Sequence, residues 1–301
     1  MDGILIIDKP AGLTSHDVVA RVRRILRTKR VGHTGTLDPF ATGVLVLVIG
    51  SATRLARFLD KDAKEYTAEV QFGFETDTGD RTGTRSAECG MRNEEIEERI
   101  STADWESVFS KFRGELLQTP PMYSAKKIAG KKLYELAREG KEIERKPVPV
   151  LIRELALIPN EIDNPQSTIR IRVLCSAGTY IRTLAEDIGR EVGVGAHLTN
   201  LRRTAAGKFD LSRAATIEDL DSSPTPADAL LPAEFAVSHL PEFVLPDDRI
   251  GPTKNGLPSR TEEGKYNASE FIRMTGSEGA VIAVGIYDDD EKVIRPKVVL
   301  I

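Results

Sequence analysis

The chain is poor in the residues that build disulfide frames, metal sites and membrane spans. Only two of its 301 residues are cysteines, Cys89 and Cys175, and they lie far apart without the spacing of metal ligands. This use of cysteine fits a reducing compartment and predicts no disulfide framework. No apolar run approaches the roughly 20 residues that span a bilayer, and the first residues lack the basic leader of a signal peptide. We therefore expect a cytoplasmic protein without a membrane segment.

Several signatures of common active sites are also missing. The sequence has no Walker phosphate loop, and Gly193-Val194-Gly195 lacks the third glycine of a dinucleotide fingerprint. It has no His-Glu-x-x-His run, no Cys-x-x-Cys pair and no Gly-x-Ser-x-Gly elbow. These absences leave carboxylate chemistry without a metal or cofactor, together with basic surfaces, as the chemistry that the sequence can carry.

One carboxylate stands at a turn of unusual composition. Asp38 lies in residues 31–43 (VGHTGTLDPFATG), between a glycine-rich approach and Pro39, directly before the apolar β-forming residues 44–49. Such a turn directs a side chain toward a cleft, where a carboxylate can act as a nucleophile or accept a proton. A lone Asp-Pro pair is more often a solvent-facing turn, so this assignment depends on other residues.

Charge is segregated along a mildly acidic chain. The net charge of −4 and the pI near 5.8 argue against a nucleic-acid binder of the usual basic kind. Two basic clusters nevertheless occur, and the acidic residues gather elsewhere, at 94–98 and 218–221. Such segregation can give an acidic protein one basic face, although ordinary solvated helix faces produce the same pattern. The clusters are Arg21, Arg23, Arg24, Arg27, Lys29 and Arg30, and then Lys126, Lys127, Lys131, Lys132, Lys141, Arg145 and Lys146.

Hydrophobic periodicity predicts a large mixed domain followed by a small β-rich one. Strand patterns cover 3–7, 44–49, 65–74 and 168–175, and helical spacing covers 15–26, 93–100, 105–112 and 181–188. In the alternating run Tyr66 falls on the inward face. Residues 118–150, with prolines at both ends, predict an excursion from the core. A stretch rich in Pro, Asp and Ser at 219–232 precedes β-runs at 280–287 and 292–301, which predicts a domain boundary between them.

Five blocks, in this order, resemble the TruB family of bacterial tRNA pseudouridine synthases. They are 8–15 (DKPAGLTS), 32–39 (GHTGTLDP), 64–66 (KEY), 178–182 (GTYIR), and 195–198 with 201–203 (GAHL and LRR). The resemblance implies an α+β fold with a mixed, largely antiparallel central sheet flanked by helices. It also implies a catalytic domain at 1–235, with residues 118–150 as a basic RNA-clamping insertion, and a PUA-like RNA-binding domain at 240–301.

The resemblance implies a reaction and its catalytic residues. Uridine 55 in the T loop of tRNA would be flipped out and its link to the sugar moved from N1 to C5, without cofactor or metal. Asp38 would be the nucleophile, Arg182 would pair with it, and Tyr66 would stack on the base near C5. Whether Asp38 attacks C1′, attacks the base or removes a sugar proton stays open.

The same resemblance implies the residues that hold the substrate. His33, Tyr66, Tyr180 and Leu201 would bind the uridine or fill the RNA stack that it leaves. The residues implied to bind RNA are Lys9, Lys126, Lys127, Lys131, Lys132, Arg202 and Arg203. The partner would be the T-stem loop of tRNA, and we expect a monomer with no obligate protein partner and no membrane contact.

Three other functions stay open at the level of the sequence. They are a guide-RNA-dependent relative of the same superfamily, an RNA chaperone that refolds the tRNA elbow, and a glycosidase-like hydrolase that releases uracil. The basic insertion and the exact sequence of residues 32–43 (GHTGTLDPFATG) favour the stand-alone enzyme. The hydrolase lacks an identifiable second carboxylate, and a chaperone role is compatible with catalysis because base flipping already opens the RNA.

Overall fold

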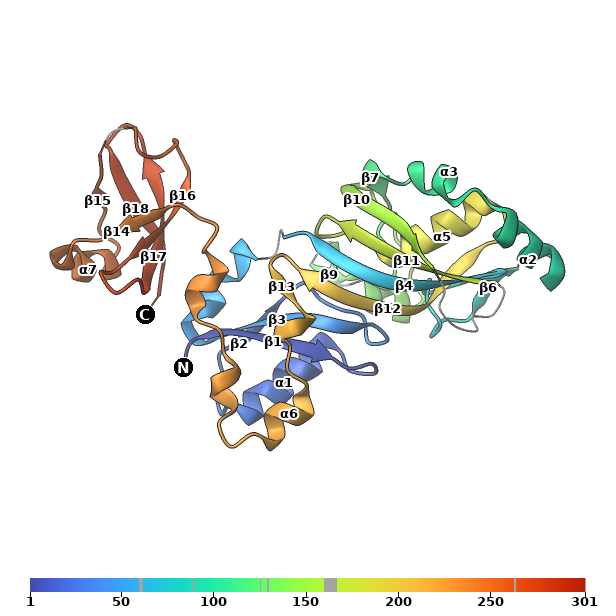
Figure 1. Ribbon diagram of the computed structural model, residues 1–301, viewed down its shortest axis with the longest axis horizontal. Coiled ribbons are helices and arrows are strands. Elements are labelled where there is room, and N and C mark those ends of the chain that lie inside the picture. The colour runs from blue at the N-terminus through green and yellow to red at the C-terminus, as the bar shows by residue number, and fades with distance from the viewer. Residues whose placement is uncertain are drawn as a thin grey trace.

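The computed structural model describes residues 1–59, 62–88, 90–124, 126–128, 130–159, 167–262 and 264–300. Of residues 87, 88, 127, 128, 132 and 138 it describes the backbone alone. Cys89 and the side chains of Lys127 and Lys132 therefore lie outside the described residues. Two sheets dominate the described part, a large central one and a smaller one near the C-terminus (Figure 1).

The central sheet is mixed and largely antiparallel, as predicted. Its described strands run in the order β1-β3-β12-β4-β11-β10-β7, with β2 paired to β3 and β13 to β12. Only the β3–β12 pairing is parallel, where Arg202 lies opposite Thr42. The strands are β1 (Gly3–Lys9), β2 (Val31–Thr34), β3 (Thr42–Ile49), β4 (Lys64–Phe72), β7 (Gly114–Gln118), β10 (Val148–Ile158), β11 (Thr168–Cys175), β12 (Ala196–Ala206) and β13 (Phe209–Asp210).

Helices cover the face of this sheet that carries Tyr66. Helix α1 (Ser15–Ile25) begins at Thr14, whose hydroxyl accepts from Asp17 N in a capping box, and buries Val18, Val19 and Val22. Helix α5 (Ile181–Val192) packs beside β12 and ends at Gly193, in the left-handed conformation that glycine tolerates. Together these elements form the main core, with α2 (Asn93–Thr102) and α3 (Trp105–Ser110) at the end of the sheet remote from α1 (Figure 1).

The opposite face of β1 and β3 packs against short helices and the C-terminal sheet. The elements here are η1 (Gly50–Phe58), η2 (Leu211–Arg213) and η4 (Ala233–Ala236), whereas α6 (Ile217–Ser222) and η3 (Pro226–Ala229) pack on the side of α1 (Figure 1). Residues of η1 and η4 join the apolar cluster of this face, to which Val281, Val284 and Val298 of the C-terminal sheet also belong. The sheet face is therefore covered by a separate β-rich unit.

That C-terminal unit is a five-stranded sheet with one helix, consistent with a PUA-like fold. Its order is β14-β16-β17-β18-β15. The Phe58 and Phe271 rings meet at 5.2 Å, and Arg54 donates to the Val299 carbonyl at 2.6 Å, so η1 is its docking element. The elements are β14 (Glu242–Val244), α7 (Asp247–Lys254), β15 (Ser259–Arg260), β16 (Phe271–Thr275), β17 (Val281–Asp288) and β18 (Val293–Val299).

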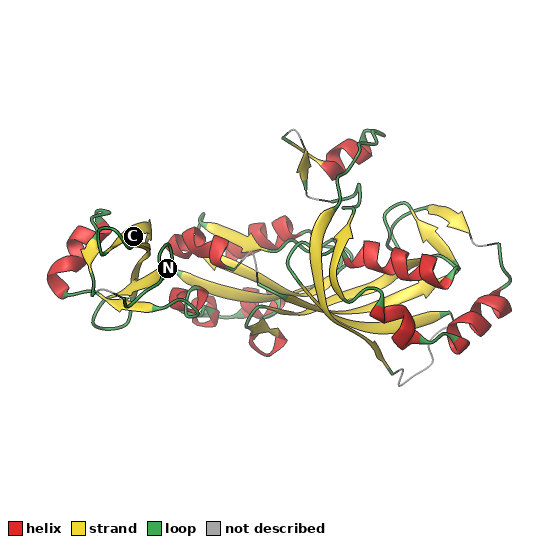
Figure 2. Cartoon of the chain, turned by 90° about the horizontal axis from the view of Figure 1, so that it is seen from above, coloured by secondary structure: helices red, strands yellow, loops and turns green. Residues whose placement is uncertain are grey.

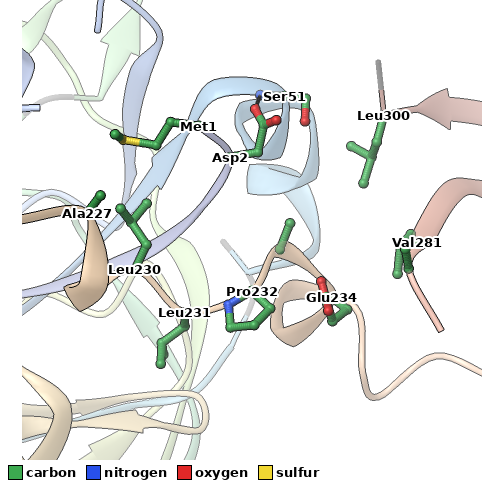
Figure 3. A pocket seen from close by; sticks show the side chains of 12 residues that line it. Met1, Asp2, Ser51, Ala227, Leu230, Leu231, Pro232, Glu234, Val281 and Leu300 are labelled. Atoms are coloured by element: carbon green, nitrogen blue, oxygen red, sulfur yellow. Dashed lines mark hydrogen bonds between the residues drawn. The ribbon is translucent and has the colours of Figure 1, made fainter. Parts of the chain in front are cut away.

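A cavity of about 560 Å³ lies between the two sheets. The linker residues Leu230, Leu231 and Pro232 form one side of it, and Val281 and Leu300 face them from the C-terminal unit (Figure 3). Its carboxylate Asp2 already accepts a hydrogen bond from Ser51 N at 2.5 Å. The cavity's other carboxylate is Glu234, and its lining includes no lysine or arginine side chain to pair with either carboxylate.

The excursion after Gln118 stands away from the central sheet. It carries β8 (Lys127–Ile128), β9 (Lys131–Lys132) and α4 (Leu133–Arg138), and in the view from above this ribbon and helix project from the body (Figure 2). A further ribbon, β5 (Phe74–Thr76) with β6 (Arg85–Glu88), follows β4. Among the described residues no helix has the length and apolar character needed to cross a bilayer.

The sequence pattern missed two strands of the central sheet. β7 and β10 flank the excursion, which therefore occupies residues 119–147, and Pro149 lies inside β10 opposite Leu117. A proline near the start of a strand loses little pairing, but it disguises the strand in the sequence. Residues 50–58, which directly follow β3, form a 3-10 helix.

Candidate active site

The turn that carries Asp38 is held from three sides by distant residues. Ser15 Oγ accepts from Leu37 N at 2.9 Å and donates to Leu37 O at 3.2 Å. Lys9 Nζ donates to Pro39 O at 3.2 Å, as well as to the carbonyls of two residues near it in sequence. The Arg203 guanidinium donates to Gly35 O at 2.8 Å and to Val44 O at 2.7 Å. The carboxylate thus stands on a loop whose backbone is fixed before any substrate arrives.

Arg182, in the first turn of α5, pairs with Asp38. Its Nε lies 2.9 Å from Asp38 Oδ2, and only 4% of its side chain is exposed. The other two nitrogens donate to Thr78 O and Tyr123 O, each at 2.7 Å. Because every nitrogen of the guanidinium has an acceptor, this buried cation has one orientation.

A cavity of about 280 Å³ opens over this ion pair. It brings six predicted site residues together: Asp38, Tyr66, Tyr180, Arg182, Leu201 and Arg203. They come from the β2–β3 turn, β4, the start of α5 and β12, which lie far apart in the sequence. The volume is at the lower end for small-molecule sites, so it suits a single flipped nucleotide rather than a paired helix.

Burial raises the pKa of Asp38 above its ordinary value. The neighbouring Arg182 opposes this rise in pKa, whereas the negative charge of Asp80 adds to it. About a third of the Asp38 side chain (34%) is open, and that part faces the cavity. The carboxylate is thus poorly hydrated yet accessible, as a nucleophile must be.

The environment of Tyr66 favours a neutral phenol. Tyr66 is buried on the inward face of β4, and burial raises the pKa of its hydroxyl, while the nearby Arg203 opposes that rise. A phenol of raised pKa remains protonated at neutral pH, which supports stacking on a base over proton abstraction by a phenolate.

His33 lies beside the cavity, outside its lining. Its ring meets the edge of His16 with centroids 5.3 Å apart, and its Nδ1 is enclosed without a hydrogen-bond partner among the described residues. Burial, with the nearby His16 and Arg203, lowers the pKa of His33 to about 4. The ring is therefore neutral at physiological pH and suited to stacking in an RNA helix.

Three of the residues expected to bind RNA make contacts within the protein. Lys9 is fully buried and Arg203 is 1% exposed, so their charges hold backbone carbonyls and cannot reach a phosphate in this conformation. Arg202 alternates with Leu201 and Arg203 along β12, which puts it on the face opposite the cavity. There it pairs with Asp8 at 2.7 Å. Arg202 keeps 37% of its side chain exposed, whereas Lys9 and Arg203 are enclosed.

Two of the four predicted insertion lysines can be described in full. Lys131 is exposed and Lys126 is half-buried, which leaves both open to a partner. The side chains of Lys127 and Lys132 lie outside the described residues. The base of the insertion is fixed, because Arg145 donates to Pro120 O at 3.1 Å.

Two residues of the site were not found from the sequence. Asp80, 4% exposed, faces Arg182 at 3.7 Å on the side away from Asp38. The Gln118 side chain accepts from Tyr180 N at 2.7 Å and donates to Tyr180 O at 2.9 Å, which fixes the residue before α5. Asp80 ends the polar run 76–80, and only its pairing with the distant Arg182 distinguishes it from other loop carboxylates.

Neither a metal nor a thiol site accompanies these residues in the described ranges. No group of three His, Cys, Asp or Glu side chains is placed to hold a metal there. Cys175 is buried, and burial raises the pKa of its thiol to about 11, which makes it a poor nucleophile. The cavity offers the Asp38 carboxylate, the guanidinium groups of Arg182 and Arg203, and aromatic surfaces as its chemistry.

Comparisons with known proteins agree with this geometry. Residues 23–181 match the model of the TruB family pseudouridylate synthase N-terminal domain, and residues 182–250 match the tRNA pseudouridylate synthase B C-terminal domain. The chain is 42% identical over 293 residues to tRNA pseudouridine synthase B of Solibacter usitatus, covering 95% of both chains. It is 39% identical over 291 residues to that of Bacillus subtilis, covering 94% of this chain and 92% of the relative.

Solved structures with the same fold include a Cbf5-Nop10-Gar1 complex. One chain of it superposes with a TM-score of 0.71 at 26% identity, covering 99% of this chain and 85% of that chain. An H/ACA RNP bound to a substrate RNA containing 2′-deoxyuridine gives a TM-score of 0.70 at 24% identity, with the same coverage, and shares the fold.

Proposed function

The chain belongs to the TruB family of pseudouridylate synthases, and from this membership we propose that it isomerises uridine 55 in the T loop of tRNA to pseudouridine. The observation that carries the proposal is the Asp38–Arg182 pair at 2.9 Å, at the floor of a nucleotide-sized cavity with Tyr66 and Leu201 in its walls. The relatives named tRNA pseudouridine synthase B support tRNA as the substrate.

Each residue of the cavity would contribute a distinct step. Asp38 would act as the nucleophile while the N1–C1′ bond breaks, and Arg182 would hold its carboxylate toward the reacting atoms. Tyr66 and Leu201 would sandwich the uracil ring while it turns, until C5 bonds to C1′ and the C5 proton leaves. His33 would occupy the gap that the flipped nucleotide leaves in the RNA stack.

Exposed cations near the cavity would bind the RNA backbone. Arg27, Lys29 and Arg30 follow α1 and are exposed, and none forms an ion pair with a carboxylate in the described ranges. The first two, with Arg23 and Arg24, border an open hollow of about 520 Å³. Since α1 rises about 15 Å from Ser15, beside the Asp38 turn, this basic end lies within the span of one tRNA arm.

We propose the domain division 1–235 and 240–301, with Lys126 and Lys131 of the insertion contacting the T-stem. The protein would act as a stand-alone monomer, because the RNA-binding cations and the cavity lie on one chain. No partner protein would be required, in contrast to the Cbf5-Nop10-Gar1 complex, which contains two further proteins.

The test is pseudouridine formation in a tRNA transcript carrying tritium at C5 of uridine. Wild-type protein should release tritium and give pseudouridine at position 55, and Asp38→Asn should lower the rate by at least about a thousandfold. Modification at the wild-type rate by Asp38→Asn would refute the catalytic assignment. Release of free uracil would identify a hydrolase instead.

A tRNA-folding activity is a second candidate, favoured by the exposed cations that lie outside the catalytic cavity. Asp38→Asn protein should then still accelerate refolding of a misfolded tRNA. If refolding is no faster with this variant than without protein, the chaperone role is absent.

A further inference from the structure

Ser124 places an unsatisfied hydroxyl in the wall of the catalytic cavity. The residue is 4% exposed, and its Oγ is enclosed without a hydrogen-bond partner among the described residues. It lines the same cavity as Asp38 and Tyr180. A buried hydroxyl without a partner destabilises the folded protein, so the presence of a serine here is not explained by stability.

The backbone of Ser124 is tied to the insertion on one side and to the catalytic arginine on the other. Its carbonyl accepts from Tyr134 N of α4 at 3.1 Å, and its N–H donates to Met122 O at 3.0 Å. The carbonyl of the preceding residue, Tyr123, accepts a hydrogen bond from Arg182 at 2.7 Å. The position of the hydroxyl therefore depends on how the insertion sits over the cavity.

The surroundings of this hydroxyl suit a polar edge of the substrate. Tyr180 is the polar neighbour of Ser124. Burial raises the pKa of the Tyr180 phenol, and the nearby Ser124 hydroxyl lowers it, although no hydrogen bond of ordinary geometry joins the two side chains. The cavity is also lined by the apolar Leu201 and Ile181 and the ring of Tyr66, and its other polar side chains include Thr36, Thr179, Lys64 and Arg203. An apolar side chain at 124 would fill the same space without an unpaired oxygen.

We infer that the Ser124 hydroxyl hydrogen-bonds the flipped uridine and so couples the seating of the basic insertion on RNA to the placement of the base. This rests on the proposed function. In this bond the Ser124 hydroxyl is the donor, so its partner is a uracil oxygen or the ribose 2′-hydroxyl. The bond supplies in the complex the partner that Ser124 lacks in the free protein.

The test compares Ser124→Ala with wild type on a T-arm RNA hairpin and on three analogues. The analogues carry sulfur in place of either uracil oxygen, or hydrogen in place of the 2′-hydroxyl, at the target nucleotide. Single-turnover rate, KM and the thermal midpoint of the free protein are measured. Ser110→Ala serves as the matched control, because it removes an exposed serine hydroxyl of α3.

On the natural hairpin Ser124→Ala should be about tenfold slower, with a thermal midpoint equal to or above that of wild type. On one analogue the two proteins should have the same rate, because that RNA lacks the atom that Ser124 binds. Ser110→Ala should match wild type on every RNA.

Three outcomes would overturn the inference. One is equal rates of Ser124→Ala and wild type on the natural hairpin. A second is an unchanged rate ratio across all three analogues. The third is a lowered thermal midpoint with a proportional loss of activity, which would indicate a structural role. A wild-type protein that forms no pseudouridine would refute the proposed function itself, a result that these three comparisons cannot produce.

Discussion

Two groups of cations lie within about 20 Å of Asp38 and differ in almost every property except charge. Lys9, Arg182 and Arg203 are buried and bonded to carbonyls or carboxylates around the catalytic turn. Arg27 and Lys29, at the end of α1, are exposed and border an open hollow. The first group fixes atoms within the protein, whereas the second presents charge to whatever approaches.

The difference shows that a basic motif has to be divided by burial before it is assigned to RNA. A buried guanidinium with every nitrogen bonded acts through geometry and is little affected by salt. An exposed cation acts through the counterions that it displaces from a phosphate backbone, so its effect falls steeply with ionic strength. Substitutions in the buried group should therefore change stability or catalysis, whereas substitutions in the exposed group should change the salt-dependent affinity for RNA.

The largest effect is expected at Arg203. Arg203→Met leaves the carbonyls of Gly35 and Val44 without their buried donor and should lower the free energy of unfolding by about 3 kcal/mol. The control is its neighbour: Arg202→Met removes a half-exposed pair with Asp8 and should cost about 1 kcal/mol or less. Urea unfolding followed by fluorescence measures both. Equal losses would mean that burial does not distinguish the two arginines.

A smaller effect, confined to catalysis, is expected at Asp80. Asp80→Asn removes one of the two carboxylates that orient Arg182 and should lower kcat by roughly ten- to a hundredfold, with the Kd for tRNA unchanged. Asp77→Asn, three residues earlier and exposed, should keep the wild-type kcat. A weakened Kd in Asp80→Asn would show that Asp80 acts on RNA binding rather than on Arg182.

Local patterns were enough to predict the turn at Asp38 before an apolar strand and the inward face of Tyr66, whereas the role of Asp38 came from the family resemblance. The position of Asp38 before an apolar run and the alternation of residues 65–74 both depend on neighbouring residues, and the structure has the same arrangement. The central sheet was predicted as mixed and largely antiparallel through the family resemblance, and this is confirmed. Such features need no knowledge of what lies across the sheet.

What escaped prediction depends on contacts between distant segments. Lys9 and Arg203 look like RNA ligands until the sheet brings both against the Asp38 turn. Asp80 becomes part of the site only because residues 76–80 pass beside α5, and Ser124 only because the insertion returns to the cavity. No periodicity in the sequence reports such approaches.

Charge reversal at the exposed group should weaken binding by about tenfold. Arg27→Glu with Lys29→Glu replaces two cations of the hollow and should raise the Kd for tRNA at low salt, with kcat unchanged at saturating RNA. The difference from wild type should shrink as salt rises. The control is Lys111→Glu. Lys111 follows α3, far from the hollow, and pairs with Glu191, so this substitution should leave the Kd for tRNA unchanged. A salt-independent loss would point to misfolding instead.

The smallest effect, and the one that tests the buried group most directly, is on the pH profile. Since burial raises the pKa of Asp38, the rate of a single turnover should fall with acidification about a midpoint above 3.8, the ordinary value for Asp. The folded state binds this proton more readily than the unfolded chain, so the contribution of Asp38 to stability decreases as pH rises from 3.8 through the raised pKa.

Asp80→Asn removes a negative charge that raises the pKa of Asp38, and should shift the midpoint of its residual rate to lower pH. Arg27→Glu with Lys29→Glu should leave the midpoint in place, because those side chains are hydrated and do not contact Asp38. If the pH midpoint shifted in Arg27→Glu with Lys29→Glu but not in Asp80→Asn, the exposed cations and not Asp80 would control the pKa of Asp38.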